Sequence, residues 1–367
     1  MSQQHDDPNA ANAADAPAAS TEVTPDPQAE RDGGAGLPPM PPAPPPPPAD
    51  KRGEAKYGPS RVKRLHAFVV IGVGVAALVL GLLKVLPGGA VAGGSLLLLG
   101  LVLLGLSFVP TREPPGDAPP PMSEGARLAG IFFEPSSVFQ NLRAHPRWLV
   151  AFLLIVALSF AYTQAFTRRV TPERIVGFTM DKVVEAGFMP AEMAERAKAE
   201  QIEAAKSPAQ IAAGAASTFT SMFVFTAIIA ALYMLAVMVF GGRIGYWQAL
   251  AVAVHAALPA IVVDKLLSFV ILYLKDPADL HPLLGQNTLV TDNLGALVSP
   301  AEHPVIFSMA TAVGVLSFYR LWLLATGLRH GSERLSKTSA WVVALIFWLI
   351  IVLFGVVMSL LFPQFIS

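Results

Sequence analysis

The sequence predicts an all-α integral membrane protein in which seven transmembrane helices follow a disordered, proline-rich tail. Of its 367 residues, 53% are hydrophobic and only 14% are charged, against about 25% charged in a soluble domain. A hydrocarbon core of about 30 Å needs about 20 helical residues. Stretches of that length with few or no charges occur at 65–86, 90–109, 148–167, 217–240, 249–274, 304–327 and 340–362.

Composition and the lack of known motifs exclude several functions. The formal net charge is zero, which argues against a nucleic-acid-binding protein. The chain has no cysteine, so disulfides, thiolate nucleophiles and cysteine-bound zinc are excluded. Its histidines are scattered without metal-ligand spacing, and the sequence has no zinc-protease, nucleophile-elbow or phosphate-loop motif. We therefore expect no enzyme activity, no catalytic residue, no metal and no cofactor.

Residues 1–64 are expected to form a disordered tail on the cytoplasmic side, because they are polar and nearly free of aromatic residues. Within the tail, residues 37–48 are dense in proline and favour an extended polyproline helix. They are either a docking site for a proline-recognition domain or a stiff spacer. A basic cluster just before the first span either binds anionic head groups or holds this end inside. Its members are Lys51, Arg52, Lys56, Arg61, Lys63 and Arg64.

A helical hairpin over 65–110 is expected to follow the tail, with its turn at 87–89 (Pro-Gly-Gly). Small residues at four-residue spacing, such as Ala77 and Gly81, would let its helices approach closely. Residues 111–130 read as a second proline-rich linker, which separates the hairpin from a membrane domain over 131–367.

The membrane domain is expected to begin with a short amphipathic helix over 131–147 that lies in the head-group region. Later, the polar loop 168–214 should contain one helix starting at Pro172 and another over 191–206. Basic residues in short loops set the orientation. Loop 275–303 has one basic residue, whereas Arg329, Arg334 and Lys337 lie in the next loop. The N-terminus is therefore predicted to be cytoplasmic and the C-terminus extracytoplasmic, although the loop 168–214 then carries seven basic residues outside.

Charged residues within the predicted spans form the candidate intramembrane site. Asp264 and Lys265 lie in the fifth span, where an ionised side chain costs about 2.5–3.5 kcal/mol. Because adjacent helical residues point about 100° apart, we expect each to need its own partner. The remaining candidates are Arg320, facing Asp264 from the sixth span if the spans are staggered, and His255, one turn before Pro259. Structural pairing, an ion or proton path, and head-group contact all remain open.

Two segments carry a family resemblance. Residues 132–148 resemble the N-terminal segment of the Yip domain family (Ypt/Rab-interacting membrane proteins), whose prokaryotic members place Pro-x-x-x-Phe and then Pro-x-Trp before the first span. Residues 241–259 are similar to that family's loop between its second and third spans, and five spans after residue 147 is the family's number. The positions that match the motifs are Pro135, Phe139, Pro146, Trp148, Gly241, Gly242, Tyr246 and Pro259.

The resemblance covers about 131–367 and implies a five-helix, Yip-like bundle after the hairpin. The Asp-Leu-Tyr-Gly-Pro motif of eukaryotic members is missing, so the chain resembles the prokaryotic branch, which implies the cell (inner) membrane, and Rab GTPase binding is not carried over. The family has no catalytic residues. The resemblance implies a non-enzymatic adaptor or organiser of membrane proteins or lipids, in contact with the bilayer. The alternative, from the intramembrane charges, is a small transporter or channel.

Overall fold

The computed structural model describes residues 57–114, 118–290 and 292–362, all within one compact unit, Ala55–Ser367. Residues 1–56 of the predicted tail, including the proline-dense segment 37–48, lie outside the described residues. The described elements are helices, apart from a short antiparallel pair of strands, β1 (Tyr57–Gly58) and β2 (Thr111–Arg112). The prediction of an all-α membrane protein is confirmed at this level.

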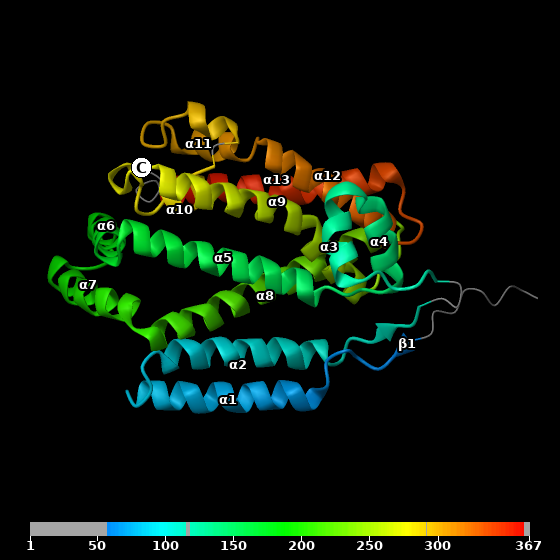
Figure 1. Cartoon of the computed structure of the whole chain (residues 1–367), viewed down its shortest axis with the longest axis horizontal. Coiled ribbons are helices and arrows are strands. Elements are labelled where there is room, and N and C mark those ends of the chain that lie inside the picture. Colours follow the sequence, from blue (N-terminus) through cyan, green and yellow to red (C-terminus); the bar gives the residue numbers. More distant parts are fainter. Residues whose placement is uncertain (1–56, 115–117, 291, 363–367) are drawn as a thin grey trace, which may run out of the picture. The chain divides into compact units, whose positions relative to one another are not determined.

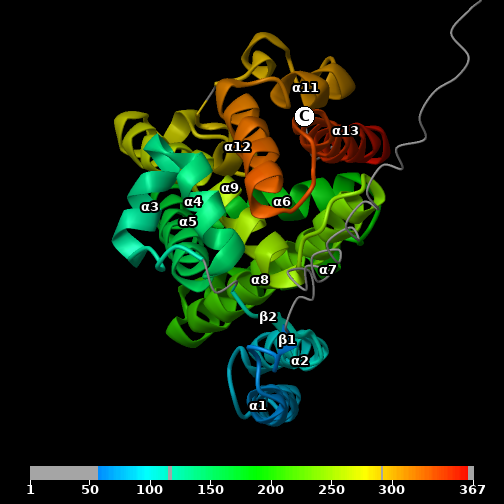
Figure 2. The same ribbon diagram turned by 90° about the vertical axis from the view of Figure 1, so that its right-hand side faces the viewer.

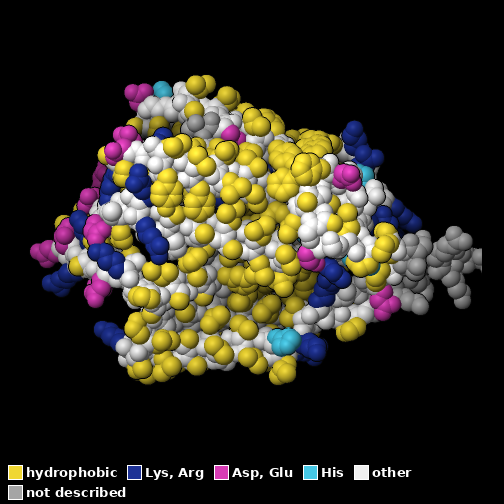
Figure 3. Space-filling model, viewed as in Figure 1, with side chains coloured by type: hydrophobic (Ala, Val, Ile, Leu, Met, Phe, Trp, Pro, Cys, Tyr) yellow, Lys and Arg dark blue, Asp and Glu magenta, His cyan; other side chains and the backbone are white. Residues whose placement is uncertain are grey.

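Six helices in the described ranges are long and apolar enough to cross a membrane, and they correspond to six of the seven predicted spans. They run side by side, and Figure 3 shows hydrophobic side chains covering much of the surface between two charged ends. α8 begins earlier than predicted, because Pro208 occupies the first helical turn and an alanine-rich stretch follows it. The six are α1 (Arg64–Leu82), α2 (Gly89–Leu106), α5 (Leu149–Val170), α8 (Pro208–Val239), α9 (Tyr246–Leu274) and α13 (Lys337–Leu361).

The predicted continuous span 304–327 is wrong. It is broken into α11 (Pro304–Thr311) and α12 (Val315–Gly331). The freed backbone groups at the break find partners in the preceding loop. The carboxylate of Asp292 accepts from the Leu316 amide at 2.8 Å, and the Leu294 amide donates to the Val313 carbonyl at 3.0 Å. Gly314 permits this contact, since a Cβ there would lie 2.8 Å from the Cβ of Asn293.

Short helices gather at the two ends of the bundle (Figure 1). One end, the α6 end, holds α6 (Pro172–Glu185), α7 (Ala191–Lys206), η1 (Pro277–Asp279), α10 (Gly285–Thr288), η2 (Leu294–Leu297) and α11. Here α6 starts at Pro172 and α7 spans 191–206, as predicted. The opposite end, the α4 end, holds α3 (Glu124–Phe133), α4 (Pro135–Ala144) and the strand pair.

The α4 end differs from the prediction of a single amphipathic helix over 131–147. α3 begins inside the predicted linker 111–130, because Ser123 caps it by accepting from the Ala126 amide at 3.2 Å. Pro135 then disfavours helical geometry at Glu134 and starts α4 in its own first turn. The result is two helices joined at Glu134, with the apolar face of α4 buried through Val138, Phe139 and Leu142.

The core of the domain is organised around α9, which contacts α5, α8 and α12 (Figure 2). Nearly every residue between Tyr246 and Ala260 is buried, including Trp247. Aromatic side chains of neighbouring helices fill the remaining space: Trp148 stacks on Phe223 with ring centroids 5.5 Å apart. α9 is therefore the central helix of the bundle at its α4 end.

The α1–α2 hairpin packs through glycines on both helices. Gly74, Gly81, Gly93 and Gly100 each lie against the backbone of the partner helix, so closely that a Cβ would overlap it. α2 in turn packs against α8. Because lipid tails are as apolar as the helices, such close backbone contact supplies the attraction that apolar burial supplies in water. The predicted close approach at Gly81 is confirmed. Gly72 and Ala76 have the same four-residue spacing in the sequence, but a Cβ at Gly72 would meet no described atom within 4 Å, so close packing is not seen there.

Adjacent glycines in α2 provide a matched test of this packing. We expect Gly93→Ala to destabilise the protein by about 1–3 kcal/mol, because its Cβ would lie 2.2 Å from the Leu78 amide nitrogen. A methyl group at Gly94 would meet no described atom within 4 Å, so Gly94→Ala should be neutral or slightly stabilising. Thermal unfolding of both variants in detergent measures the difference. Equal melting temperatures would contradict the packing.

His281, in the loop at the α6 end, must be neutral to accept the hydrogen bonds that it makes there. Its Nδ1 accepts from the Leu283 and Leu284 amides at 3.1 and 3.0 Å, and its ring meets the edge of Phe178. Burial, and after it the positive charges of Arg174 and Lys182, lower the pKa of His281 below its ordinary value of 6.5. The unfolded state therefore binds more protons below about pH 6.5, and the stabilisation is complete above that pH and lost as the pH falls through the folded-state pKa.

Hydrogen exchange of the Leu283 and Leu284 amides measures this effect. Relative to intrinsic rates, we expect clearly weaker protection at about pH 5 than at about pH 7.5, because protonated Nδ1 cannot accept. His281→Asn is the control, since its side-chain oxygen can accept the same amides at either pH. Equal pH dependence in both proteins would show that His281 is not the titrating group.

Candidate functional site

The four candidate intramembrane residues do not form one site. His255 is buried in α9 at 1% exposure, and its Nδ1 bonds the Ala251 carbonyl one turn earlier at 2.9 Å. Asp264 lies on the same helix, about 13 Å further along at 1.5 Å per residue. Arg320, on α12, lines a cavity to which neither residue contributes. His255 therefore has the surroundings of a packed histidine with a backbone partner.

Asp264 and Lys265 satisfy each other, contrary to the expectation that adjacent helical residues cannot. The Lys265 ammonium lies 2.9 Å from the Asp264 carboxylate, because the long lysine side chain reaches around the helix. It also sits over the ring of Tyr162 on α5, 4.8 Å from the centroid. The expected partnership of Asp264 with Arg320 is wrong, since no ion pair joins them among the described residues.

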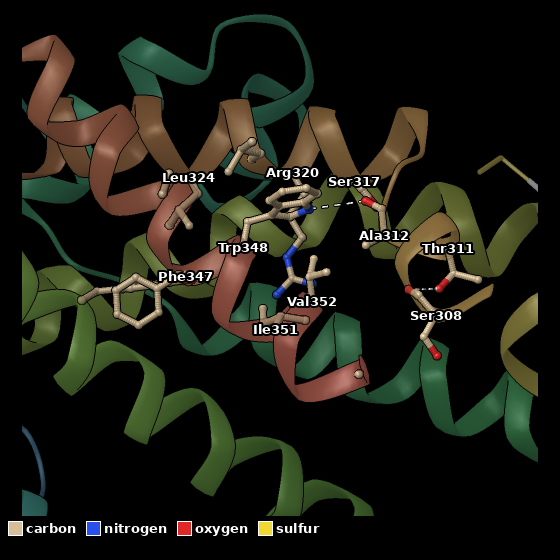
Figure 4. A pocket seen from close by; sticks show the side chains of 14 residues that line it. Ser308, Thr311, Ala312, Ser317, Arg320, Leu324, Phe347, Trp348, Ile351 and Val352 are labelled. Carbon is tan, nitrogen blue, oxygen red and sulfur yellow. Dashed lines mark hydrogen bonds between the residues drawn. The ribbon is translucent and has the colours of Figure 1, made fainter. Parts of the chain in front are cut away.

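Arg320 projects into a cavity of about 360 Å³ between α12 and α13 (Figure 4). Leu324, Phe347, Trp348, Ile351 and Val352 form its apolar lining, and Ser308, Thr311 and Ser317 are its polar members besides Arg320 and Tyr233. The Trp348 indole nitrogen donates to the Ala312 carbonyl at the break between α11 and α12, over 3.3 Å. The cavity therefore adjoins the helix break.

A second, polar cavity of about 320 Å³ lies at the α4 end, and sequence reasoning did not predict it. Glu333, in the loop after α12, is at its centre. Its carboxylate pairs with Arg112 of β2 at 2.9 Å and with Arg143 of α4 at 3.5 Å. Its backbone pairs with that of Arg243 on the α8–α9 loop. Gln248 of α9 completes the cluster by donating to the Arg143 carbonyl at 3.3 Å.

The partners of Glu333 lie far from it in sequence, so no sequence motif predicts the cluster. The one available hint is that Glu333 is an acidic residue in a loop whose neighbouring charges in sequence, Arg329, Arg334 and Lys337, are basic. A third cavity, of about 390 Å³, adjoins the same end and is lined by Gly58, Arg61, Arg112 and Arg147 among others. The first described residues of the chain therefore enter the bundle beside this polar surface.

The predicted motif positions pack around the same end. Pro135 starts α4, and Phe139, fully buried, faces α12 where Gly327 leaves room for its ring. The Pro146 carbonyl accepts from the Arg61 guanidinium at 2.8 Å. Trp148 directly precedes α5 and stacks on α8 through Phe223.

The second group of motif positions makes the turn from α8 into α9. Gly241 has a φ of 77°, a conformation that favours glycine, and Gly242 lies close to Val237 and Leu335. The Tyr246 hydroxyl donates to the Ala227 carbonyl of α8 at 3.2 Å. Pro259 is buried within α9, which is helical on both sides of it. Apart from Pro259, which lies halfway along α9, both groups thus hold the helices together at the α4 end.

Comparison with known families gives one match. Residues 129–359, well over half of the chain, match the family described as Yip1 domain. The chain belongs to the Yip1 domain family. No curated protein and no solved structure matches it.

The match to the Yip1 domain begins within α3 and ends in the last turn of α13. It includes every predicted motif position and leaves out the α1–α2 hairpin, as the resemblance implied. The Yip1 family is not a known enzyme family. In the described ranges, no group of three or more His, Cys, Asp and Glu residues could hold a metal ion.

Polar contacts join the hairpin to the Yip1 domain at the α4 end. Besides the Arg112–Glu333 pair, the Trp247 indole donates to the Val109 carbonyl at 3.4 Å. Arg61, just before α1, donates to the Pro146 carbonyl of the domain at 2.8 Å, while Ser60 donates to the Leu106 carbonyl at 2.8 Å and so ties the start of α1 to the end of α2. The polar surface at this end is therefore shared by the hairpin and the Yip1 domain.

Substitutions test the pairing of Asp264 with Lys265. Either Asp264→Leu or Lys265→Leu alone leaves an unpaired charge in an apolar span, and we expect each to cost about 2.5–3.5 kcal/mol. The double variant should recover most of the stability, because replacing a buried ion pair by apolar side chains is often neutral. Yield of monodisperse protein and melting temperature in detergent are the measurements. Additive losses in the double variant would disprove the pairing.

Proposed function

We propose that this Yip1-family protein is a non-enzymatic adaptor or organiser of membrane proteins, which acts through the polar surface at its α4 end. The observation that carries the proposal is the cluster around Glu333. It brings charged side chains from β2, α4 and the loop after α12 together around a cavity of about 320 Å³. Arg112, Arg143 and Glu333 are a quarter to a half exposed, so they remain available to polar groups of a partner.

The proposed topology places the α4 end and the N-terminus in the cytoplasm and the C-terminus outside, with seven crossings. Six are the long helices, and the seventh is α11 followed by α12. Basic residues of short connections lie at the α4 end, namely Arg243, Arg329, Arg334 and Lys337, which supports a cytoplasmic assignment. In this topology residues 1–56 belong to the cytoplasmic side, and we propose their proline-dense segment 37–48 as a second contact for a partner. By resemblance to the prokaryotic branch, the membrane is a cell (inner) membrane.

The alternative is a small transporter or channel. One observation favours it: the break between α11 and α12 lines a cavity, as discontinuous helices do in many transporters. Against it, Asp264 pairs with Lys265 and His255 bonds its own helix, so these residues are not left free to bind an ion. Single cysteines at 261–268, probed with a polar thiol reagent from both sides, separate the two functions. The adaptor predicts slow labelling throughout, and a transporter predicts fast labelling on one helical face.

Site-specific photo-cross-linking tests the adaptor role directly. A photoreactive amino acid at Gln140 or Ala144, which line the polar cavity, should give discrete protein adducts in native membranes. The same amino acid at Leu353, on the exposed apolar face of α13, is the matched control and should give none. Glu333→Lys should abolish the adducts, because it reverses the central charge of the cluster. Adducts unaffected by Glu333→Lys, or their complete absence, would contradict the proposed surface.

A further inference from the structure

Arg320 is an exposed cation, and no hydrogen bond or ion pair joins its guanidinium to any residue in the described ranges. Tyr233, which lines the same cavity, lies close enough to interact with its charge but is no acid that could neutralise it. Lys265, also a basic residue well inside a span, pairs with the Asp264 carboxylate and lies over the Tyr162 ring. An uncompensated charge at membrane depth is unfavourable, so the contrast with Lys265 indicates that an anion from outside the chain compensates Arg320.

The cavity beside Arg320 is polar on one side and apolar on the other. Ser317 precedes Arg320 by one helical turn and therefore lies on the same face of α12. Toward the α6 end, Ser308 of α11, which also lines the cavity, shares a hydrogen bond with the buried Ser359 of α13. On the other side lie Leu324, Phe347 and Ile351 (Figure 4). An amphiphile can contact both the polar and the apolar side of the cavity, whereas a free ion would interact only with the polar side.

Access also fits an amphiphile. Val352, drawn beside the Arg320 guanidinium in Figure 4, lies about 13 Å from the end of α13 at 1.5 Å per residue, so a head group that reaches the arginine sinks toward the middle of the bilayer and needs its charge compensated there. The surroundings of the cavity are open on the bilayer-facing surface: Val315, Phe318 and Ile351 are at least half exposed. A volume of about 360 Å³ is near the lower limit of ligand pockets, enough for a head group and part of one chain.

We propose that this cavity binds an anionic lipid of the bilayer. Its phosphate or carboxylate pairs with the Arg320 guanidinium, which is suited to two parallel hydrogen bonds, and the Ser317 hydroxyl donates a further one. One acyl chain lies along the apolar wall formed by α12 and α13. The lipid enters sideways from the bilayer. This inference does not depend on the adaptor role, because it concerns a different surface.

Cross-linking to photoactivatable lipids tests the proposal on the full chain. The protein is reconstituted in phosphatidylcholine vesicles with equal small fractions of diazirine-bearing phosphatidylglycerol or diazirine-bearing phosphatidylcholine, and cross-linked peptides are mapped. We expect the anionic lipid to label α12 and α13 at the cavity about tenfold more than the zwitterionic one, because only the anionic lipid has a net negative charge to pair with Arg320; tenfold corresponds to about 1.4 kcal/mol. Labelling of exposed α1 residues such as Val69 and Val73, remote from the cavity, is the internal reference.

Variants identify the residue responsible. Arg320→Gln should remove the preference, so that the anionic and zwitterionic lipids label the cavity about equally. Arg320→Lys should keep part of the preference, because it keeps the positive charge. Arg329→Gln, at the other end of the same helix, should leave it unchanged. Equal labelling of the wild-type cavity by both lipids overturns the proposal even if Arg320→Gln does not fold. Loss of the preference on adding inorganic phosphate overturns it too, because the site would then bind a free anion.

Discussion

Inside hydrocarbon, every backbone amide and carbonyl must find its partner within the protein, and most of this structure follows from that requirement. Six long helices meet it with their own hydrogen bonds. In the stretch 304–327, which is broken into α11 and α12, the preceding loop supplies partners, since Asp292 accepts the first amides of α12. Asp264 and Lys265 follow the same rule, because each is the other's partner.

Helix association follows from close contact, because lipid offers no hydrophobic driving force between apolar helices. In the hairpin, glycines bring α1 and α2 to backbone contact. Around α9, large aromatic side chains fill the space instead, with Phe139 seated where Gly327 leaves room. Apart from Pro259, the positions predicted from the family resemblance lie at the α4 end, where α4, α9 and α12 meet. They build the framework that presents the polar cavity around Glu333.

Hydropathy predicts most of the fold, because membrane crossing depends on local composition alone. The helices at Pro172 and 191–206 are also local, set by proline and by alanine with charge. The break after Thr311 is not predictable in this way: Ala312, Val313 and Gly314 are as apolar or small as their neighbours, and the loop that replaces their hydrogen bonds precedes them by about 20 residues. The pairing of Asp264 with Lys265 depends on the length and flexibility of the lysine side chain. Helical geometry alone gives only the directions in which adjacent side chains start, so it does not predict the pair. Glu333 finds Arg112 and Arg143 only through tertiary folding.

The alternation of the helices between two ends is the central claim, and labelling in sealed vesicles tests it most directly. The chain has no cysteine, so single cysteines at Gln201 on α7 and Thr338 at the start of α13 report without background. Both positions are exposed, at the α6 end and the α4 end respectively. A membrane-impermeant maleimide should label the two from opposite sides of the vesicle. Labelling of both from the same side would contradict the account.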